Sequence, residues 1–400
     1  MLFAQVVYFD KIFSPTIKTV QIHQNGKELS VPIIYLSKQN TLLLEFDDLR
    51  EETLRYEYTL VHCSYDWKES PMDKDLYIEG FDVQPIENYK NSFNTIKRYV
   101  HYSQKIPSNG MKILKSGNYA IKVFTENNPD NVVFTKRFYC VDDIANIKVE
   151  VKQSAITELM DTHQEVNVKV SGKGSNFFSS PEQYMKVVVY QNERQDNPHI
   201  LKMRGMIGNK IDYSFDESNQ FFGGNEFRFF DFTSLRLKTQ NVAGFDFLNN
   251  ENQVYLIKEK NLSRLPYSSS KDLNGQYYIR NEYGDYAIQS DYAWVHFFFP
   301  SDINLEGAYY VVGEMTNGQM SESNRMQYVD NEYHLALYLK QGYYNYQILF
   351  KRPDSLVGSY IQTEGNHWET NNRYKVFVYY HNFADNYDSL IGFTSIEFNR

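Results

Sequence analysis

The segment with the clearest potential for chemistry is His62-Cys63-Ser64-Tyr65-Asp66, which places an imidazole, a thiol, a hydroxyl and a carboxylate close together. The surrounding residues are typical of a β-strand, and successive side chains of a strand point to opposite faces. His62 and Ser64 then share one face while Cys63 and Tyr65 share the other, so the potential ligands diverge. We therefore predict a structural role for this segment. The nine histidines of the chain show neither the His-x-His nor the His-Glu-x-x-His spacing of zinc sites.

Other catalytic signatures are missing from the sequence as well. It contains no Gly-x-Ser-x-Gly nucleophile elbow, no Gly-x-x-x-x-Gly-Lys phosphate loop and no Gly-x-Gly-x-x-Gly fingerprint. The acidic pairs Asp47-Asp48 and Asp142-Asp143, and also Asp385 or Asp388, offer carboxylates for glycoside hydrolysis, but each adjoins the end of a predicted strand, where acidic residues commonly solvate turns. We predict a protein without catalytic residues, metal or cofactor, and expect no small-molecule substrate.

Composition narrows the partners and the fold class. The 400-residue chain has 41 basic and 50 acidic residues, a formal net charge of -9, so it lacks the cationic field that nucleic acid requires. Its 34 Tyr and 28 Phe suit pleated sheets better than helices. No apolar stretch reaches the roughly 18 residues of a membrane-spanning helix. The two cysteines, Cys63 and Cys140, are predicted as buried free thiols, although one bridge between them stays open.

The pattern along the chain indicates an all-β protein. Seven short β-rich runs separated by turn signals lie between residues 17 and 141, which is typical of a β-sandwich. Asn25-Gly26 predicts a tight hairpin between the first two runs. The longer polar and aromatic excursion 64–98 interrupts this pattern, and long loops of this kind are often functional. We predict tandem immunoglobulin-like or early-set-like β-sandwiches, with domains at 1–144, 145–290 and 291–400.

Several phrases of the sequence resemble the type IX secretion system plug protein family, and they occur in the expected order over almost the whole chain. They include Val61-His62-Cys63-Ser64-Tyr65-Asp66-Trp67, Ser92-Phe93-Asn94-Thr95, Gly223-Gly224-Asn225-Glu226-Phe227-Arg228-Phe229-Phe230-Asp231 and Leu339-Lys340-Gln341-Gly342-Tyr343-Tyr344-Asn345-Tyr346.

The resemblance implies an exported protein of Bacteroidota-type bacteria that is not an enzyme. Its expected partner is the barrel protein of the outer-membrane translocon, whose periplasmic end it blocks when no substrate carrier is engaged. The expected location is the periplasm, at the inner face of the outer membrane. Met1-Leu2-Phe3-Ala4 reads only as the remnant of an export signal. Trp67 and Gly117 are expected to serve folding, as a packing anchor and a bend.

A carbohydrate-binding protein of the periplasm or cell surface is the alternative, and an accessory hydrolase is a third interpretation. The C-terminal segment resembles early-set sandwiches that bind α-glucans, in which a Trp after the glycine loop stacks on the sugar. The corresponding loop here is Thr316-Asn317-Gly318-Gln319-Met320, which has no Trp. A gate needs a broad protein-facing surface, whereas a lectin or a hydrolase needs a local groove with converging polar groups.

Overall fold

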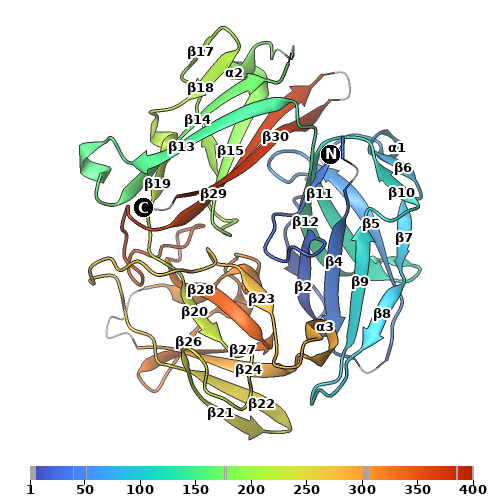
Figure 1. Ribbon diagram of the computed structural model, residues 1–400, viewed down its shortest axis with the longest axis vertical. Coiled ribbons are helices and arrows are strands. Elements are labelled where there is room, and N and C mark those ends of the chain that lie inside the picture. Colours follow the sequence, from blue (N-terminus) through green and yellow to red (C-terminus); the bar gives the residue numbers. More distant parts are fainter. Residues whose placement is uncertain are drawn as a thin grey trace.

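The computed structural model describes residues 6–38, 40–50, 52–174, 176, 178–300, 306–383 and 386–398. The expected signal remnant, Met1 to Ala4, lies outside these residues. The described chain is all-β, as predicted, and is built from several mainly antiparallel sheets (Figure 1). Its α-helices are single turns, namely α1 (Lys74–Tyr77), α2 (Pro181–Tyr184) and α3 (Tyr286–Gln289).

The first unit of the fold is a sandwich of two sheets, drawn on the right of Figure 1. A two-stranded sheet at one end pairs β10 (Met111–Ile113) with β6 (Ile78–Gly80). The strands of one main sheet are β1 (Lys11–Ile12), β12 (Asn128–Val141), β11 (Gly117–Thr125), β5 (Tyr56–Cys63) and β7 (Val83–Ile86), with β3 (Ile33–Tyr35) beside β12. The strands of the other are β2 (Ile17–Gln24), β4 (Leu42–Asp48), β9 (Val100–Ile106) and β8 (Asn88–Asn91).

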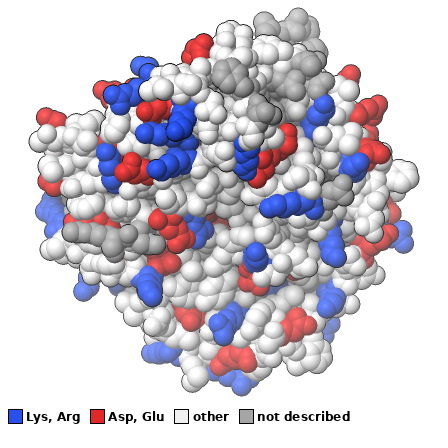
Figure 2. Space-filling view, turned by 45° about the horizontal axis from the view of Figure 1, so that its top comes forward, with Lys and Arg blue, Asp and Glu red and all other residues white. Residues whose placement is uncertain are grey.

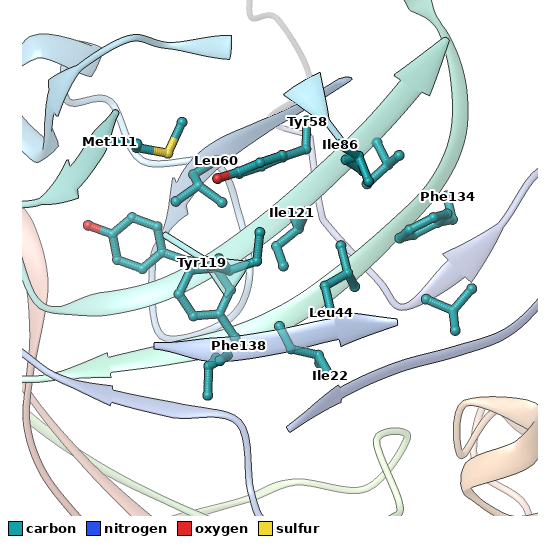
Figure 3. Packing of buried hydrophobic residues seen from close by; sticks show 14 of the residues in the cluster. Ile22, Leu44, Tyr58, Leu60, Ile86, Met111, Tyr119, Ile121, Phe134 and Phe138 are labelled. Atoms are coloured by element: carbon teal, nitrogen blue, oxygen red, sulfur yellow. The ribbon is translucent and has the colours of Figure 1, made fainter. Parts of the chain in front are cut away.

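Alternating side chains explain why these strands form a sandwich. In β4 the buried Leu42, Leu44 and Phe46 alternate with less buried neighbours, so one face of the strand turns to the core. Figure 3 shows Leu44 meeting Ile121 between the two sheets. Burying this apolar surface is the dominant favourable contribution to folding.

The expected hairpin at Asn25-Gly26 is only partly present. The turn forms, with Lys27 N donating to Gln24 O at 2.8 Å and Gly26 at φ +73°. The following strand, β3, does not pair with β2, however. It pairs in parallel with β12, while β2 pairs with β4. The turn signal is local, but the choice of strand partner is decided by distant residues.

The second unit is also a two-sheet sandwich. One sheet contains β13 (Ala145–Gln153), β14 (His163–Gly172), β18 (Lys210–Tyr213) and β17 (Gly205–Ile207), with β19 (Gln220–Phe222) beside β14. The other contains β16 (His199–Leu201), β15 (Met185–Gln191), β29 (Asn372–Asn382) and β30 (Tyr387–Phe398). Figure 1 shows the red C-terminal strands lying beside the green β15.

The third unit occupies the lower part of Figure 1. One layer is formed by β20 (Arg228–Asp231), β28 (Gly342–Lys351), β23 (Tyr277–Ile279) and β25 (Ala308–Val312). The other is formed by β21 (Val242–Leu248), β22 (Glu251–Leu256), β24 (Tyr292–Phe299), β27 (Glu332–Lys340) and β26 (Gln327–Val329).

Strand pairing crosses the expected domain boundary at residue 290. β22 pairs with β24 and β23 with β28 across it, and β15 pairs with β29. The buried clusters divide in the same way: one joins residues 145–221 to residues 374–391, and another spans residues 230–350. In place of 145–290 and 291–400 we therefore propose units at 145–222 plus 372–400 and at 223–371, after a first unit at 1–144. The third unit is thus inserted into the second.

Candidate functional site: the junction of the three units

The first and third units meet at a buried ion pair. Lys340, at the end of β27, donates from Nζ to Asp47 Oδ2 of β4 at 2.6 Å, and each side chain is 1% exposed. The same ammonium donates to the carbonyl oxygen of Ala287 at 2.7 Å. The hydroxyl of Tyr292 also donates to Asp47 Oδ2, at 2.7 Å. Asp47 is therefore held by donors from two strands of the third unit.

The ion pair continues into the first unit as a chain of alternating acids and bases. His101 Nδ1 lies 2.7 Å from Asp47 Oδ1, and its Nε2 lies 3.3 Å from Glu45. Glu45 is in turn 3.0 Å from His23 Nε2. This arrangement links five titratable side chains from four strands, β2, β4, β9 and β27. We call Lys340, Asp47, His101, Glu45 and His23 the polar joint.

Proton affinities in the polar joint follow from burial and from these partners. Burial alone would raise the pKa of Asp47, but the charge of Lys340 and the hydrogen bond to His101 hold that pKa below its usual value. Burial opposes ionisation of Glu45 too, yet its hydrogen bonds to His101 and His23 lower its pKa to about 2. Burial would lower the pKa of His101, but its bonds to Asp47 and Glu45 raise it. The joint thus favours charged acids and charged histidines.

The end of the predicted excursion 64–98 completes this interface. Asp291 accepts hydrogen bonds from the backbone N–H groups of Ile96 and Lys97, at 2.7 and 3.1 Å. Tyr99 donates its hydroxyl to the carbonyl oxygen of Ser290 at 2.8 Å, and Phe93 N donates to Ile288 O at 2.9 Å. This part of the excursion therefore docks the first unit onto the third.

The first and second units meet through aromatic packing. Tyr139 stacks on Phe377 with ring centroids 4.2 Å apart. The indole N–H of Trp67 donates to the hydroxyl of Tyr190 at 3.3 Å, and the guanidinium of Arg137 lies over the Trp67 ring at 4.2 Å. Trp67 is 3% exposed, which confirms the prediction of a packing anchor.

The second and third units are joined by two chain crossings, because the third is inserted into the second. The crossings lie side by side: Asn372 Nδ2 donates to the carbonyl oxygen of Gly223 at 2.7 Å. Gln164 Nε2 donates to the carbonyl oxygens of Trp368 and Thr370, at 2.6 and 2.7 Å. Because hydrogen bonds hold both crossings, the second and third units rotate relative to each other much less freely than two domains joined by a single linker.

A small charged cavity lies where the three units meet. Its volume is about 70 Å³, enough for a few water molecules but too small for the ligands that protein pockets usually hold. Glu314 lies at its edge, and burial together with the charge of Glu193 raises the pKa of Glu314 to about 7. Charged residues of all three units line it, including Asp10, Lys136 and Arg137, then Glu193, Arg194 and Lys375, and finally Glu314.

The segment His62 to Asp66 is not assembled for chemistry. His62 Nε2 lies 3.1 Å from the carbonyl oxygen of Ser116, and burial lowers the pKa of His62 to about 4. Cys63 packs with Trp67 on one face of the sheet, whereas Cys140 belongs to the core on the other face. Both thiols are free. Among the described residues, no group of three His, Cys, Asp or Glu side chains could hold a metal ion.

The carboxylates considered for glycoside hydrolysis take part in separate contacts: Lys173 Nζ lies 2.6 Å from Asp143 Oδ2 and His381 Nδ1 lies 3.1 Å from Asp388 Oδ1, while Asp385 lies outside the described residues. Asp47 lies in the polar joint, while Asp48 accepts from the Tyr56 hydroxyl at 2.8 Å and from Arg50 Nε at 2.9 Å. Sequence reasoning assigned no role in a site to Lys340 or His101. No sequence signal could have joined Lys340 to Asp47, because 293 positions separate them.

The loop that would carry the sugar-stacking Trp in α-glucan-binding sandwiches packs against the first unit instead. Lys136 Nζ donates to Asn317 Oδ1 at 3.1 Å, and Gln319 Nε2 donates to the carbonyl oxygen of Asp10 at 3.0 Å. The loop is therefore used in the contact between the first and third units.

The fold and the junction define an all-β protein of packed sandwich units. Residues 17–142 match the family described as the Type 9 secretion system plug protein 1st domain. The chain belongs to the type IX secretion system plug protein family, and this membership indicates a role in type IX secretion. A crystal structure of a hypothetical protein from Parabacteroides merdae ATCC 43184 is similar, with 33% identity and a TM-score of 0.95 over 98% of this chain and 100% of that one.

A comparison with curated proteins finds no match. Within the described residues, no helix is long and apolar enough to cross a membrane.

Proposed function

We propose that this protein is a non-enzymatic plug that occludes the periplasmic end of the type IX outer-membrane translocon barrel when no carrier is bound. Its partner is then the barrel protein, and its place is the periplasm, at the inner face of the outer membrane. Membership of the plug family supports the assignment to this secretion system.

The observation that carries the proposal is the pairwise joining of the three units. A stopper that must cover a wide pore needs a body that does not fold aside, and each pair of units here has an interface of its own. The polar joint fixes the first unit to the third, aromatic packing fixes the first to the second, and two chain crossings fix the second to the third. We expect a closed arrangement of this kind to move as one body.

The aromatic outer face of the β24–β27 sheet gives little support to carbohydrate binding. Tyr255 and His296 stack with ring centroids 4.6 Å apart and an angle of 14° between the planes. Phe298 and His334 stack at 5.0 Å and 24°. Because these rings already stack on one another, part of each ring surface is covered, which disfavours stacking on a sugar.

Deletion of the gene in a bacterium with a type IX system tests the proposal. We expect the outer membrane to become permeable to large fluorescent solutes, and a tagged copy of the protein to co-purify with the barrel in mild detergent. Complementation with the natural gene should restore exclusion. A gene carrying Lys340→Met should restore less exclusion of solutes than a gene carrying Lys112→Met. Lys340 forms the buried pair of the polar joint, whereas Lys112 forms only an exposed pair with Glu79. Normal exclusion by the deletion strain, without co-purification of a barrel, would refute the plug.

A further inference from the structure

The outer face of the β13–β14–β18–β17 sheet carries cations that are not neutralised by partners. Lys148 and Lys169 stand directly opposite each other on β13 and β14, and like charges in that position destabilise a sheet. Both are exposed, as are Lys210 and Arg204. Among the described residues, none of these three lysines has an ion-pair partner. Figure 2, which brings the top of the molecule forward, shows basic side chains gathered at the upper left, with acidic ones among them.

Acidic residues on this face do not cancel the charge. Glu150 is exposed on β13, and Asp212 on β18 stands opposite Lys169 without reaching ion-pair distance. Lys152 is neutralised by Glu165 at 3.4 Å. Four cations therefore face two acids on this surface, although the whole chain has a net charge of -9. The local excess indicates an anionic partner.

Two exposed apolar side chains flank these cations. Ile207 is 86% exposed at the tip of the β17–β18 hairpin, where it stands opposite Lys210. Phe215 is 55% exposed, and Lys152 and Arg204 lie over its ring at 4.6 and 5.1 Å. Phe215 also has a φ of +60°, a backbone conformation that costs free energy for a bulky residue. The two cations over its ring make favourable contacts, but more than half of the Phe215 side chain stays exposed.

We propose that this face binds the surface of an anionic phospholipid bilayer. Lysine and arginine side chains near such a surface are attracted to the phosphate groups, and apolar side chains among them can enter the boundary between headgroups and acyl chains. A fluid lipid layer can close around a single protruding isoleucine, whereas a rigid acidic protein would need a matching pocket. Lipid binding here is independent of the plug role, because it uses neither the polar joint nor a barrel.

Co-sedimentation with sonicated vesicles tests the proposal on the full-length protein. Vesicles of phosphatidylcholine alone are compared with vesicles that contain about 40 mol% of the anionic lipid phosphatidylglycerol. We expect binding only to the anionic vesicles, weakening as salt screens the charges. Each cation near the surface contributes roughly a factor of five in partitioning. The variant Lys148→Gln/Lys169→Gln/Lys210→Gln should therefore lose on the order of a hundred-fold.

Matched controls separate this face from general surface effects. Lys105→Gln/Lys260→Gln/Lys271→Gln removes three exposed lysines elsewhere and should retain binding. Ile207→Ser should weaken partitioning about five-fold, whereas Leu356→Ser, at a site that is 89% exposed on the third unit, should leave it unchanged. Equal binding to both vesicle types, or equal losses in the test and control variants, would overturn the proposal. If anionic vesicles failed to bind while an acidic protein bound this face, the lipid proposal would also be wrong.

Discussion

The ammonium of Lys340 lies 2.6 Å from the carboxylate of Asp47, although the two residues belong to different units and are 293 positions apart. Both groups are almost fully removed from water. A buried pair of this kind contributes little net stability compared with apolar packing, but removing one member leaves an uncompensated charge. The pair therefore makes the contact between the first and third units specific: only the correct docking neutralises both charges.

Replacement of Lys340 by Met should destabilise the protein by about 3–5 kcal/mol, because Asp47 would remain buried with His101 as its only cationic partner among the described residues. Urea unfolding followed by tyrosine fluorescence measures this loss. Adding Asp47→Leu should recover part of it. The control Lys112→Met, which breaks an exposed pair with Glu79, should cost less than about 1 kcal/mol. A loss no larger than the control's would contradict the buried joint.

Stability should depend on pH through the histidines of the joint. The pKa of His101 is raised above its ordinary value of 6.5 by Asp47 and Glu45, against the effect of burial. A raised histidine pKa stabilises the fold fully below pH 6.5, and this stabilisation is lost as the pH rises through the folded-state value. The free energy of unfolding of the natural protein should exceed that of His101→Gln at low pH, and this difference should shrink as the pH rises above about 7.

Urea titrations at pH 5.5, 7 and 9 measure this difference, and comparison with the variant cancels the contributions of groups outside the polar joint. His62 is the matched control because burial lowers its pKa to about 4. Its neutral form is the stable one, so the corresponding difference for His62→Gln should not shrink at high pH. A constant difference for His101→Gln would show that folding does not raise the pKa of His101.

Substitution of Gly117 by Ala should destabilise the first unit by about 2–4 kcal/mol. Gly117 has a φ of +144°, and an added Cβ would lie 2.3 Å from His62 Nε2. His62 is enclosed by the rings of Tyr77, Tyr119 and Tyr387, so it has no room to move away. Gly205→Ala is the control, because its added Cβ meets nothing within 4 Å. Thermal unfolding compares the two, and equal midpoints would contradict this account.

The two thiols should not react in the folded protein. Cys63 and Cys140 are buried on opposite faces of one sheet, and burial raises the pKa of the Cys63 thiol to about 12, so almost no thiolate is present at neutral pH. Ellman's reagent should detect no thiol in native buffer and two per chain in denaturant. Reducing agent should not shift the urea midpoint. Rapid native labelling would mean that the first unit opens locally.

Local patterns predicted the all-β class, but not the organisation of the chain. Alternation in segments such as Leu42–Asp48 is a property of neighbouring residues, and it identified strands reliably. Which strands pair is decided by side chains far apart in sequence: β15 selects β29 across almost two hundred residues, and β3 selects β12 instead of β2. The polar joint also depends on residues that are far apart in sequence. Its neighbours in the chain indicate a turn residue at Asp47, and only the folded structure brings Lys340 to it.

The insertion of the third unit into the second predicts which shortened chains fold. Deleting residues 223–371 and joining the ends with a short Gly-Ser linker keeps β15 paired with β29, and the ends are close because Asn372 Nδ2 reaches Gly223 O at 2.7 Å. This chain should unfold cooperatively in urea and show strand-rich circular dichroism. A chain ending at residue 290 lacks β29 and β30, so Val187 and Val189 lose Val376 and Val378 of their core. We expect that chain to aggregate or to unfold without a cooperative transition. Cooperative unfolding of residues 145–290 alone would instead support three consecutive domains. The two chain crossings between the second and third units would then no longer support a rigid plug.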